Sequence, residues 1–393
     1  MRRSPRVFWA LNHATLAKTE CALLEKLGCE VLTPKVCPKE IIERSGAVDY
    51  SYDRTLTIPA ADLAVLNTCD FYASEIDPAA MELLNRHFDA IFVSAHLTMV
   101  ENFHKGYQGL LVFRAFGQEK KLTYADLLDW SRKKPRWERW RDRLLLRQGA
   151  WRRPNLLDQL VGRGKRFVFA GCYEEVIANE PALLRSTSAF LPLGLPAETW
   201  AQADTWTGGD DRVMFVCPCV HHPYYGDIYQ SFKAEMGDLP FAVYGNQAPD
   251  HGDARLVGFL PRADYDGRMR RHAAMFYHSS EPCHLHYHPL EAVAMGVPLV
   301  YMAGGMLARM SGADQPGLCR TPTEAKDKLR RILGGDRNLI DGIRSAQVRI
   351  LDEFRDEFVE QAWRQGFLGN WHDCRIPRSG ISRDSQCEAD CRS

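Results

Sequence analysis

Three histidines alternate with two bulky residues in the second half of the sequence. His284, His286 and His288 are separated by Leu285 and Tyr287, so in an extended segment all three imidazoles would lie on one side. A neutral imidazole can contact a bound substrate or act as a general base near neutral pH. The cluster is therefore a candidate for substrate contact, with His284 as a candidate catalytic residue.

A zinc site is a second interpretation of the same histidines. Cys217 and Cys219 alternate in the same way, and thiolate and imidazole are ligands that zinc prefers. The spacings match no standard zinc pattern, so we expect no bound metal. Substrate contact, plain polar lining and zinc remain as three interpretations of the histidines.

The histidines lead into a segment whose residue types suit phosphate binding. Pro289 fits the first turn of a helix, where free backbone N–H groups bind anions. Glu291 is expected in the same turn, where its carboxylate can accept hydrogen bonds from ribose hydroxyls. Upstream, Gly258 ends a predicted strand before Phe259 and Leu260, and a glycine there lets the backbone approach a ligand closely. Taken singly, a proline at a helix start followed by a glutamate is more often explained by helix capping than by ligand binding.

Strands and helices alternate along all 393 residues, which predicts an α/β protein with parallel sheets. A strand over 6–11, a helix over 16–27 and a strand from 30 onward form the first βαβ unit, and residues 64–67 are expected to form a further strand. The polar break Thr205–Asp211 divides the chain into two halves. We predict a first domain over 1–198, a second over 205–345, a helix over 346–369 and a disordered tail over 370–393.

The stretch from Asp253 to Gly305 resembles the donor-nucleotide segment of GT-B glycosyltransferases. The resemblance rests on an ordered set of matches in one βαβ unit, namely Gly258-Phe259-Leu260, Ser279 and Ser280, Pro289-Leu290-Glu291-Ala292, Ala294, Gly296 and Pro298. In the first half, residues 88–96, 111–117 and 186–196 resemble strands of that family more loosely. The resemblance implies two Rossmann-like domains that face a cleft, with a C-terminal helix that crosses back to the first domain.

The same resemblance implies where a nucleotide-sugar donor binds. The nucleotide would lie mostly on the second domain, and Glu291 would hold its ribose. The residues expected to contact it are Tyr244, Gly245, Gly258, Phe259, Leu260, Ser280, His286, His288, Pro289, Leu290 and Glu291. No cofactor is expected besides the donor, because this family stabilises the leaving diphosphate with basic side chains and a helix N-terminus. The expected acceptor is a glycan or a lipid-linked molecule of surface polysaccharide or glycoconjugate synthesis.

The catalytic residues expected with this resemblance are His13, His96 and His284. An inverting enzyme needs a general base, which His13, His96 or a carboxylate such as Glu75 would supply. A retaining enzyme needs no such base, and the sequence does not distinguish the two outcomes.

Several positions depart from the family pattern. Cys283 stands where the family has its first glutamate, Phe116 replaces a histidine, and the basic pair after the first strand of the second domain is missing. These departures leave two alternatives: a transferase for a CMP-linked acidic sugar, held by the histidines with Arg262 or Arg268, and a catalytically degenerate scaffold that binds a sugar nucleotide. An epimerase or phosphorylase of the same shape, and a non-enzymatic sugar binder, are further candidates.

A basic segment rich in tryptophan occupies Arg132–Pro154. It contains ten Lys and Arg residues against two acidic residues, with Trp137, Trp140 and Trp151 at roughly helical spacing. Such a segment suits peripheral contact with an anionic membrane surface or a phosphorylated acceptor, and equally suits a helix packed on its own domain with a solvated arginine face. The formal net charge of +0 argues against a nucleic-acid partner.

The remaining composition indicates the compartment. No secretory-type segment opens the sequence, and no apolar run reaches the roughly 18–20 residues of a membrane span. We expect a cytoplasmic protein. If the basic segment binds lipid, we expect the protein to lie at the inner face of the cell membrane. The twelve cysteines are mostly scattered in apolar contexts, which is typical of buried thiols rather than disulfides.

Overall fold

The computed structural model describes residues 3–39, 48, 53, 55–118, 122–129, 155–221, 223–245 and 252–373. The basic segment Arg132–Pro154 lies outside these residues, as do residues 374–393 of the predicted tail. In the described part, no helix is long and apolar enough to cross a bilayer.

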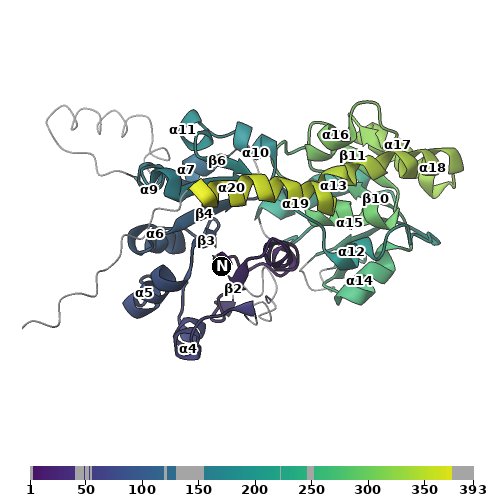
Figure 1. Ribbon diagram of the computed structural model, residues 1–393. Helices are drawn as coiled ribbons and strands as arrows, with labels where there is room; N and C mark the ends of the chain where they lie inside the picture. Colours follow the sequence, from purple (N-terminus) through teal and green to yellow (C-terminus); the bar gives the residue numbers. More distant parts are fainter. Residues whose placement is uncertain are drawn as a thin grey trace, which may run out of the picture.

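The first domain is built on a parallel sheet of six strands in the order β2-β1-β3-β4-β5-β6 (Figure 1). Phe8 pairs with Leu32 on one side and with Ile91 on the other. Helices cover both faces, so the strands are buried on both sides and read as continuous apolar runs. The strands are β1 Arg6–Trp9, β2 Glu30–Leu32, β3 Ala90–Val93, β4 Leu110–Ala115, β5 Phe167–Gly171 and β6 Ser188–Phe190.

The helices of this domain connect successive strands along the chain. The predicted helix over 16–27 forms as α1 Ala14–Leu16 and α2 Ala22–Lys26, joined by the π-helical turn Ala17–Cys21. The other helices are α4 Ala60–Thr68, α5 Pro78–His87, α6 Leu97–Gly106, α7 Tyr124–Leu128, α9 Leu156–Val161, α10 Glu174–Ala178 and α11 Ala182–Arg185.

The strand predicted over 64–67 is wrong, because these residues lie inside helix α4. A short apolar run does not by itself distinguish a buried strand from a helical segment. The flanking residues decide here: Pro59 immediately precedes the helix, and two alanines, which favour helix strongly, form its first turn.

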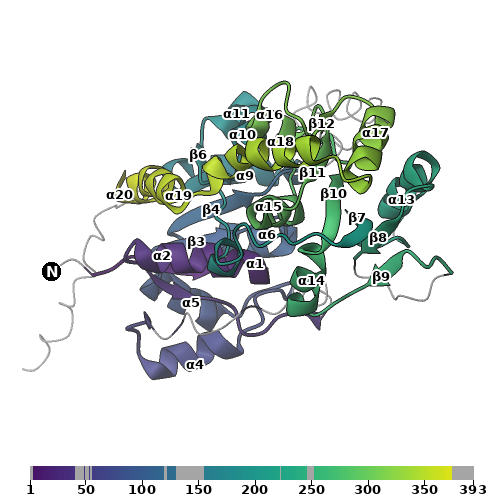
Figure 2. The ribbon, with the colours of Figure 1, turned by 90° about the vertical axis from the view of Figure 1, so that its right-hand side faces the viewer.

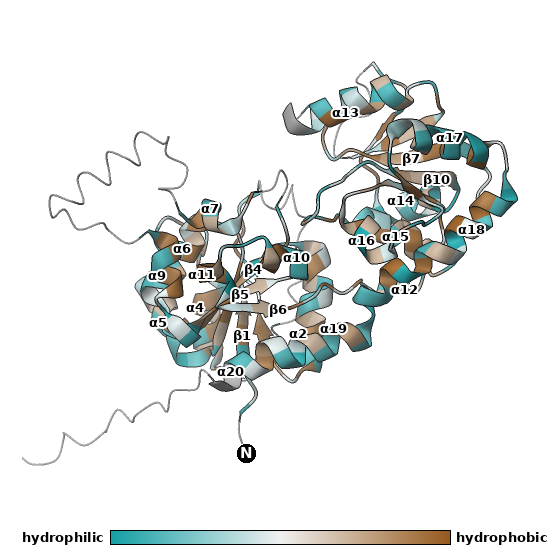
Figure 3. Ribbon diagram, turned by 90° about the horizontal axis from the view of Figure 1, so that it is seen from above, coloured by the Kyte–Doolittle hydropathy of each residue, from teal (hydrophilic) through white to brown (hydrophobic). Residues whose placement is uncertain are grey.

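The second domain repeats the architecture with a parallel sheet in the order β12-β11-β10-β7-β8-β9. Figure 3 shows the two lobes from above, each with hydrophobic strands between its helices. The strands are β7 Asp210–Val216, β8 Phe241–Tyr244, β9 Leu256–Gly258, β10 His272–Tyr277, β11 Leu299–Met302 and β12 Leu318–Cys319. The helices are α13 Pro223–Met236, α14 Arg262–Met269, α15 Tyr287–Met295, α16 Met306–Ser311, α17 Pro322–Leu333 and α18 Arg337–Gln347.

Two segments connect the lobes. The chain passes forward through α12 Ala197–Trp200, and it returns through a C-terminal segment that lies against the first domain (Figure 1, Figure 2). Trp363 of this segment donates a hydrogen bond to the Pro192 carbonyl at 2.9 Å and stacks on Phe92 at 5.9 Å between ring centroids. The chain therefore crosses back to the first domain, as predicted.

The returning segment is not the single helix predicted over 346–369. It consists of a 3-10 segment Val348–Phe354, helix α19 Asp356–Trp363, a π-helical turn Arg364–Leu368 and helix α20 Gly369–Asp373. The break falls at Arg355, whose extended backbone (ψ 141°) ends the first part. Periodicity alone did not reveal this break, because no proline or glycine marks it.

Candidate active site

The loops that follow β4 and β10 bring the two domains into contact. Gly117 has a φ of +93°, and a Cβ atom built on it would lie 1.8 Å from the Cys283 carbonyl oxygen. Close by, the Cys283 thiol donates to the Glu175 carbonyl at 3.6 Å, and Glu175 forms an ion pair with Arg309 at 2.7 Å. We call this contact region the junction. Two positions that depart from the family pattern, Cys283 and the residue before Gly117, therefore lie at the same place.

The histidine loop lies beside the junction at the start of α15. The rings of His284 and His286 are 4.6 Å apart, and those of His286 and His288 are 5.3 Å apart, measured between centroids. The Tyr277 hydroxyl and His286 Nδ1 are hydrogen-bonded at 3.2 Å. The three imidazoles are thus in contact, although the segment is not extended throughout, since His288 already belongs to helix α15.

Burial lowers the pKa of three histidines around this loop, namely His278, His286 and His288. The pKa of His286 falls to about 3, mainly because of burial and in smaller part because of the neighbouring His284 and His278. Burial also lowers the pKa of His278, at the end of β10, to about 4 and places that of His288 well below its ordinary value. At neutral pH each ring keeps a lone pair, so the cluster can accept a hydrogen bond or a proton from a ligand.

These lowered pKa values predict acid-sensitive stability. Between the ordinary histidine pKa near 6.5 and the lowered values, the unfolded chain binds protons that the folded chain does not. The free energy of unfolding should therefore have its full value above pH ~6.5. It should decrease as the pH falls toward about 4. Urea titrations at several pH values will measure this slope. His278→Gln should make the slope of stability against pH smaller, whereas the exposed control His221→Gln should leave the slope unchanged. Equal slopes in both variants would contradict the view that buried histidines cause the acid sensitivity.

The described residues give no support to the zinc interpretation. Among them, no three His, Cys, Asp or Glu side chains are placed to hold a metal ion. Burial raises the pKa of Cys217 to about 12, and its protonated thiol donates to the Tyr225 carbonyl at 3.5 Å.

Glu291 is buried and already paired. Helix α15 begins at Tyr287, two residues earlier than predicted, so Glu291 lies in its second turn rather than its first. Its side chain accepts a hydrogen bond from Arg262 Nη1 at 2.6 Å and keeps only 6% of its surface exposed, whereas 49% of the Arg262 side chain is exposed. Burial raises the pKa of Glu291 despite this pairing. A ribose would therefore meet Arg262 before it reached the carboxylate.

The expected nucleotide contacts on β8 and β9 differ in accessibility. Phe259 is 73% exposed and follows Gly258, which ends β9 with a φ of +79°. In contrast, Tyr244 is 1% exposed, and its hydroxyl is hydrogen-bonded to His272 at 2.7 Å, so its side chain belongs to the core. Gly245 follows it and is half-buried.

The remaining predicted contacts surround the start of α15. Pro289 and Leu290 are buried in its first turns, whereas Leu260 is half-buried after β9. Ser280 is exposed and lies against the glycine pair after β11, since a Cβ atom on Gly305 would be 3.1 Å from the Ser280 Cα atom. Only the exposed or half-buried members of the predicted set can meet a ligand without rearrangement.

The two histidines predicted in the first domain both cap helices. His13 follows β1, and its Nδ1 accepts a hydrogen bond from the Leu16 backbone N–H at 3.3 Å. His96 follows β3, and its Nδ1 accepts from Met99 N–H at 3.4 Å. In a neutral ring with an accepting Nδ1, the proton is on Nε2, so each ring presents a donor outward. Glu75, the third candidate base, is exposed in the loop before α5.

Sequence reasoning missed two buried polar groups on the same edge of the first sheet. Asn12 follows β1 and is 8% exposed, and within the described part of the chain neither its amide nitrogen nor its amide oxygen has a hydrogen-bond partner. Tyr173 follows β5 and is 3% exposed, and its hydroxyl has no partner among the same described residues. A polar residue directly after a buried strand was the available signal for both.

No family model and no curated protein matches this chain. Solved structures do match, including a mutant of the Thermobaculum terrenum O-GlcNAc transferase, at a TM-score of 0.52 and 14% identity over 95% of this chain and 68% of that one. The sucrose-phosphate synthase of Thermosynechococcus elongatus matches at a TM-score of 0.53 and 13% identity, over 93% of this chain and 100% of that one. The chain has the GT-B fold. A DNA-modifying β-glucosyltransferase, whose substrate is uridine diphosphoglucose, matches at a TM-score of 0.50 and 12% identity over 94% of this chain and 99% of that one.

Proposed function

We propose that this protein is a glycosyltransferase that moves a sugar from a uridine-diphosphate donor to a glycan or a lipid-linked acceptor. The observation that carries the proposal is the arrangement around α15. The segment that resembles a donor site begins this helix at the junction, on the carboxyl edge of the second sheet, where open α/β sheets bind ligands. The uridine donor of the similar β-glucosyltransferase supports uridine over cytidine as the base.

The proposed diphosphate site is the first turn of α15 with the histidine loop. His286 occupies the N-cap position without a side-chain hydrogen bond to the helix, so the first backbone N–H groups remain open to an anion. The neighbouring rings of His284 and His288 would donate to phosphate oxygens when the dianion binds. In this proposal the histidines replace the missing basic pair in binding the diphosphate. The proposal requires no bound metal or cofactor.

The acceptor would approach from the first domain. His13, His96 and Asn12, whose amide has no partner among the described residues, follow neighbouring strands of one sheet and offer donors and an acceptor for a hydroxyl group. In this proposal His284 is the group closest to the leaving diphosphate, and His13 and His96 orient the acceptor. Contact with a membrane through Arg132–Pro154 stays a prediction, since that segment lies outside the described residues.

A base-stacking role for Phe259 gives a direct mutational prediction. Phe259→Ala should weaken UDP binding about fivefold or more, because stacking of a base on an aromatic ring contributes ~1–3 kcal/mol. Its melting temperature should not change, since the ring is 73% exposed. Isothermal titration with UDP measures the loss. Phe358→Ala, which removes a ring that is 40% exposed on α19, is the matched control, and equal affinities in the two variants would rule out stacking.

A thermal-shift panel tests the proposed donor class. The full-length protein is heated with UDP, GDP, ADP or CMP, each with and without EDTA. A ligand that binds only the folded state raises the melting temperature by mass action, so we expect the largest increase with UDP and no effect of EDTA. An increase with CMP alone would replace the uridine donor by the CMP-linked acidic sugar.

A degenerate scaffold is the second candidate function, and two observations favour it. Cys283 takes the place of a family glutamate and is packed against the first domain, and Arg262 covers the carboxylate of Glu291. A scaffold of this kind would bind a sugar nucleotide without cleaving it. Nucleotide binding without turnover is the result that would favour this candidate.

A further inference from the structure

Arg262, the first residue of α14, is held by two buried carboxylates. Its Nη1 donates to Glu291 of α15 at 2.6 Å, and its Nε donates to Asp266, one turn further along α14, at 2.9 Å. Each carboxylate side chain keeps only 6% of its surface exposed, whereas 49% of the Arg262 side chain is exposed. Asp266 also accepts a hydrogen bond from Gln202 Nε2 at 2.8 Å. The guanidinium is therefore fixed in direction by groups that solvent hardly reaches.

The same guanidinium keeps donors for a ligand. Among the described residues, its Nη2 has no hydrogen-bond partner. An arginine whose other nitrogens are bound to protein carboxylates is pre-organised, so less side-chain entropy is lost when the remaining N–H groups bind a ligand. Burial alone would lower the pKa of Arg262, but Glu291 and Asp266 raise it, so the side chain stays charged.

The local charge favours a neutral partner over a phosphate group. Burial and then nearby charges, including the Glu198 carboxylate of α12, raise the pKa of Glu291. Glu198 forms an ion pair with Lys18 of the first domain. The three carboxylates thus outnumber the two cations paired with them, and this surplus of negative charge repels an anion. A guanidinium only donates, so its partner must present a neutral oxygen acceptor such as a hydroxyl group.

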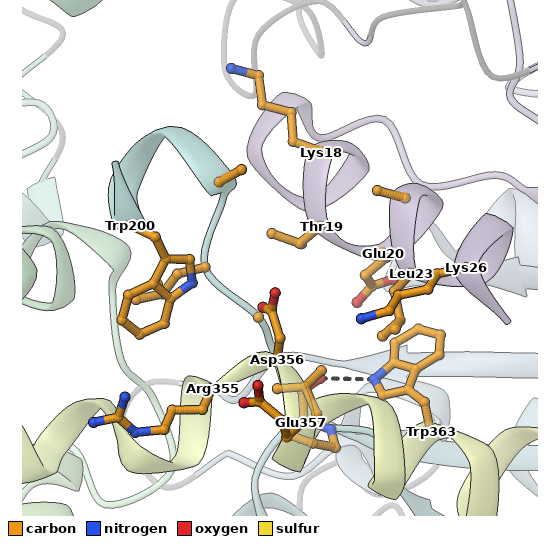
Figure 4. Close-up of a pocket in the computed structure, with 16 residues that line it drawn as sticks. Lys18, Thr19, Glu20, Leu23, Lys26, Trp200, Arg355, Asp356, Glu357 and Trp363 are labelled. Carbon is orange, nitrogen blue, oxygen red and sulfur yellow. Dashed lines mark hydrogen bonds between the residues drawn. The ribbon is translucent and has the colours of Figure 1, made fainter. Parts of the chain in front are cut away.

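A cavity of about 430 Å³ lies beside Lys18, between the helical segment 17–26, residues 192–200 and α19 (Figure 4). Lys18 lines this cavity, whereas Arg262 and Glu291 do not. An occupant of the cavity would therefore not reach the guanidinium, whose exposed side opens elsewhere.

The place of Arg262 in the chain lies between two parts of the proposed donor site. Phe259, which we propose to stack on the base, precedes it by three residues. Glu291, to which it is bonded, belongs to α15, whose first turn is the proposed diphosphate site. In a nucleoside diphosphate the ribose joins the base to the diphosphate. A donor that reaches from Phe259 to the start of α15 would thus bring its ribose to the guanidinium.

We propose that Arg262 binds the ribose of the donor by donating from Nη2 to a hydroxyl oxygen. Glu291 and Asp266 are positioning residues, because they hold the guanidinium and are themselves covered. This assignment differs from the resemblance, which implies that the carboxylate of Glu291 holds the ribose directly. The inference rests on the proposed function, since it requires a uridine nucleotide as the ligand.

Isothermal titration of the full-length protein with UDP, 2′-deoxy-UDP and 3′-deoxy-UDP tests this contact. We expect the wild type to bind at least one deoxy nucleotide about tenfold more weakly than UDP, the effect of removing one hydrogen bond to a charged group. Arg262→Met should bind UDP about tenfold more weakly and should no longer distinguish the two nucleotides, because the protein partner of the hydroxyl is gone. Glu291→Gln should keep the distinction. Arg271→Met, which removes an exposed arginine beyond the end of α14, should change neither value.

A second variant guards against loss of the fold. Arg262→Met leaves Glu291 without its partner, so Arg262→Met/Glu291→Gln removes both charges, and melting temperatures verify that both variants are folded. Equal binding of all three nucleotides by the wild type, or a distinction that survives in both Arg262 variants, would overturn the role of Arg262 while the uridine donor stands. Absence of UDP binding by the wild type would overturn the proposed donor itself, and the ribose contact with it.

Discussion

Gly117→Ala is expected to reduce sugar transfer about a hundredfold or more and to separate the two domains. A Cβ atom at this position would lie 1.8 Å from the Cys283 carbonyl oxygen, so the loop after β4 can no longer touch the loop after β10. Backbone atoms on both sides leave no flexible group to move aside. A displacement of about 1 Å in an active site can cost ~100-fold in rate, and this clash requires at least that much.

Gly209→Ala is the matched control for this variant. Gly209 has nearly the same backbone conformation, with a φ of +90° against +93°, but nothing lies within 4 Å of its Cβ position. Both variants carry the strain of an alanine at positive φ, ~1–3 kcal/mol, and only Gly117→Ala adds the clash. Turnover of a UDP-sugar and the radius of gyration by small-angle scattering measure the two effects. Unchanged values in Gly117→Ala would mean that the junction is not part of the working enzyme.

Arg114→Met is expected to lower the free energy of unfolding by about 3–5 kcal/mol, the usual cost of leaving one buried charge without its partner. Arg114 is 0% exposed, and its Nε donates to Glu20 Oε1 at 3.0 Å. The same guanidinium donates to the carbonyls of Ala170 at 3.1 Å and Leu191 at 3.0 Å, so it ties together the ends of three strands. The second oxygen of Glu20 accepts from the Trp9 indole at 3.0 Å.

Urea denaturation measures this effect, with two further variants to locate its cause. Glu20→Gln/Arg114→Met removes both charges and should be more stable than Arg114→Met alone, because no buried carboxylate is left unpaired. Arg86→Met breaks an ion pair whose side chains are 54% and 70% exposed and should cost about 1 kcal/mol at most. If Arg114→Met lost no more stability than Arg86→Met, the buried pair would contribute little to the free energy of unfolding.

The second domain was the easier half to predict because its signals are local. The helix that ends at Gly296 is marked by that glycine, which adopts a φ of +80° at the C-cap, and by the proline that follows two residues later. Pro289 marked the start to within two residues. The alternation of His284, His286 and His288 suggested that these rings lie together, and they are in contact, although His288 lies in α15 rather than in an extended segment.

The approach of Gly117 to Cys283 at the junction, and the Arg262–Glu291 pair within the second domain, were beyond the reach of sequence reasoning. The Arg262–Glu291 pair joins residues on two different helices, and the approach of Gly117 to Cys283 joins two domains. Neither has a spacing rule, because such contacts depend on how the sheets are placed in space. Ala64–Asn67 is a different case, because its local pattern suits a strand or a helix and the flanking residues of the sequence itself decide for the helix.

The most direct test of the proposed transfer is the release of UDP from a panel of UDP-sugars by the full-length protein. The panel includes UDP-glucose, UDP-galactose and UDP-N-acetylglucosamine, and Gly117→Ala is the negative control. We predict slow release of UDP from at least one donor by the wild type without an acceptor, and about a hundredfold less by the variant. Binding of UDP with no release from any donor would contradict the proposed transferase and would identify the protein as a scaffold that holds a sugar nucleotide.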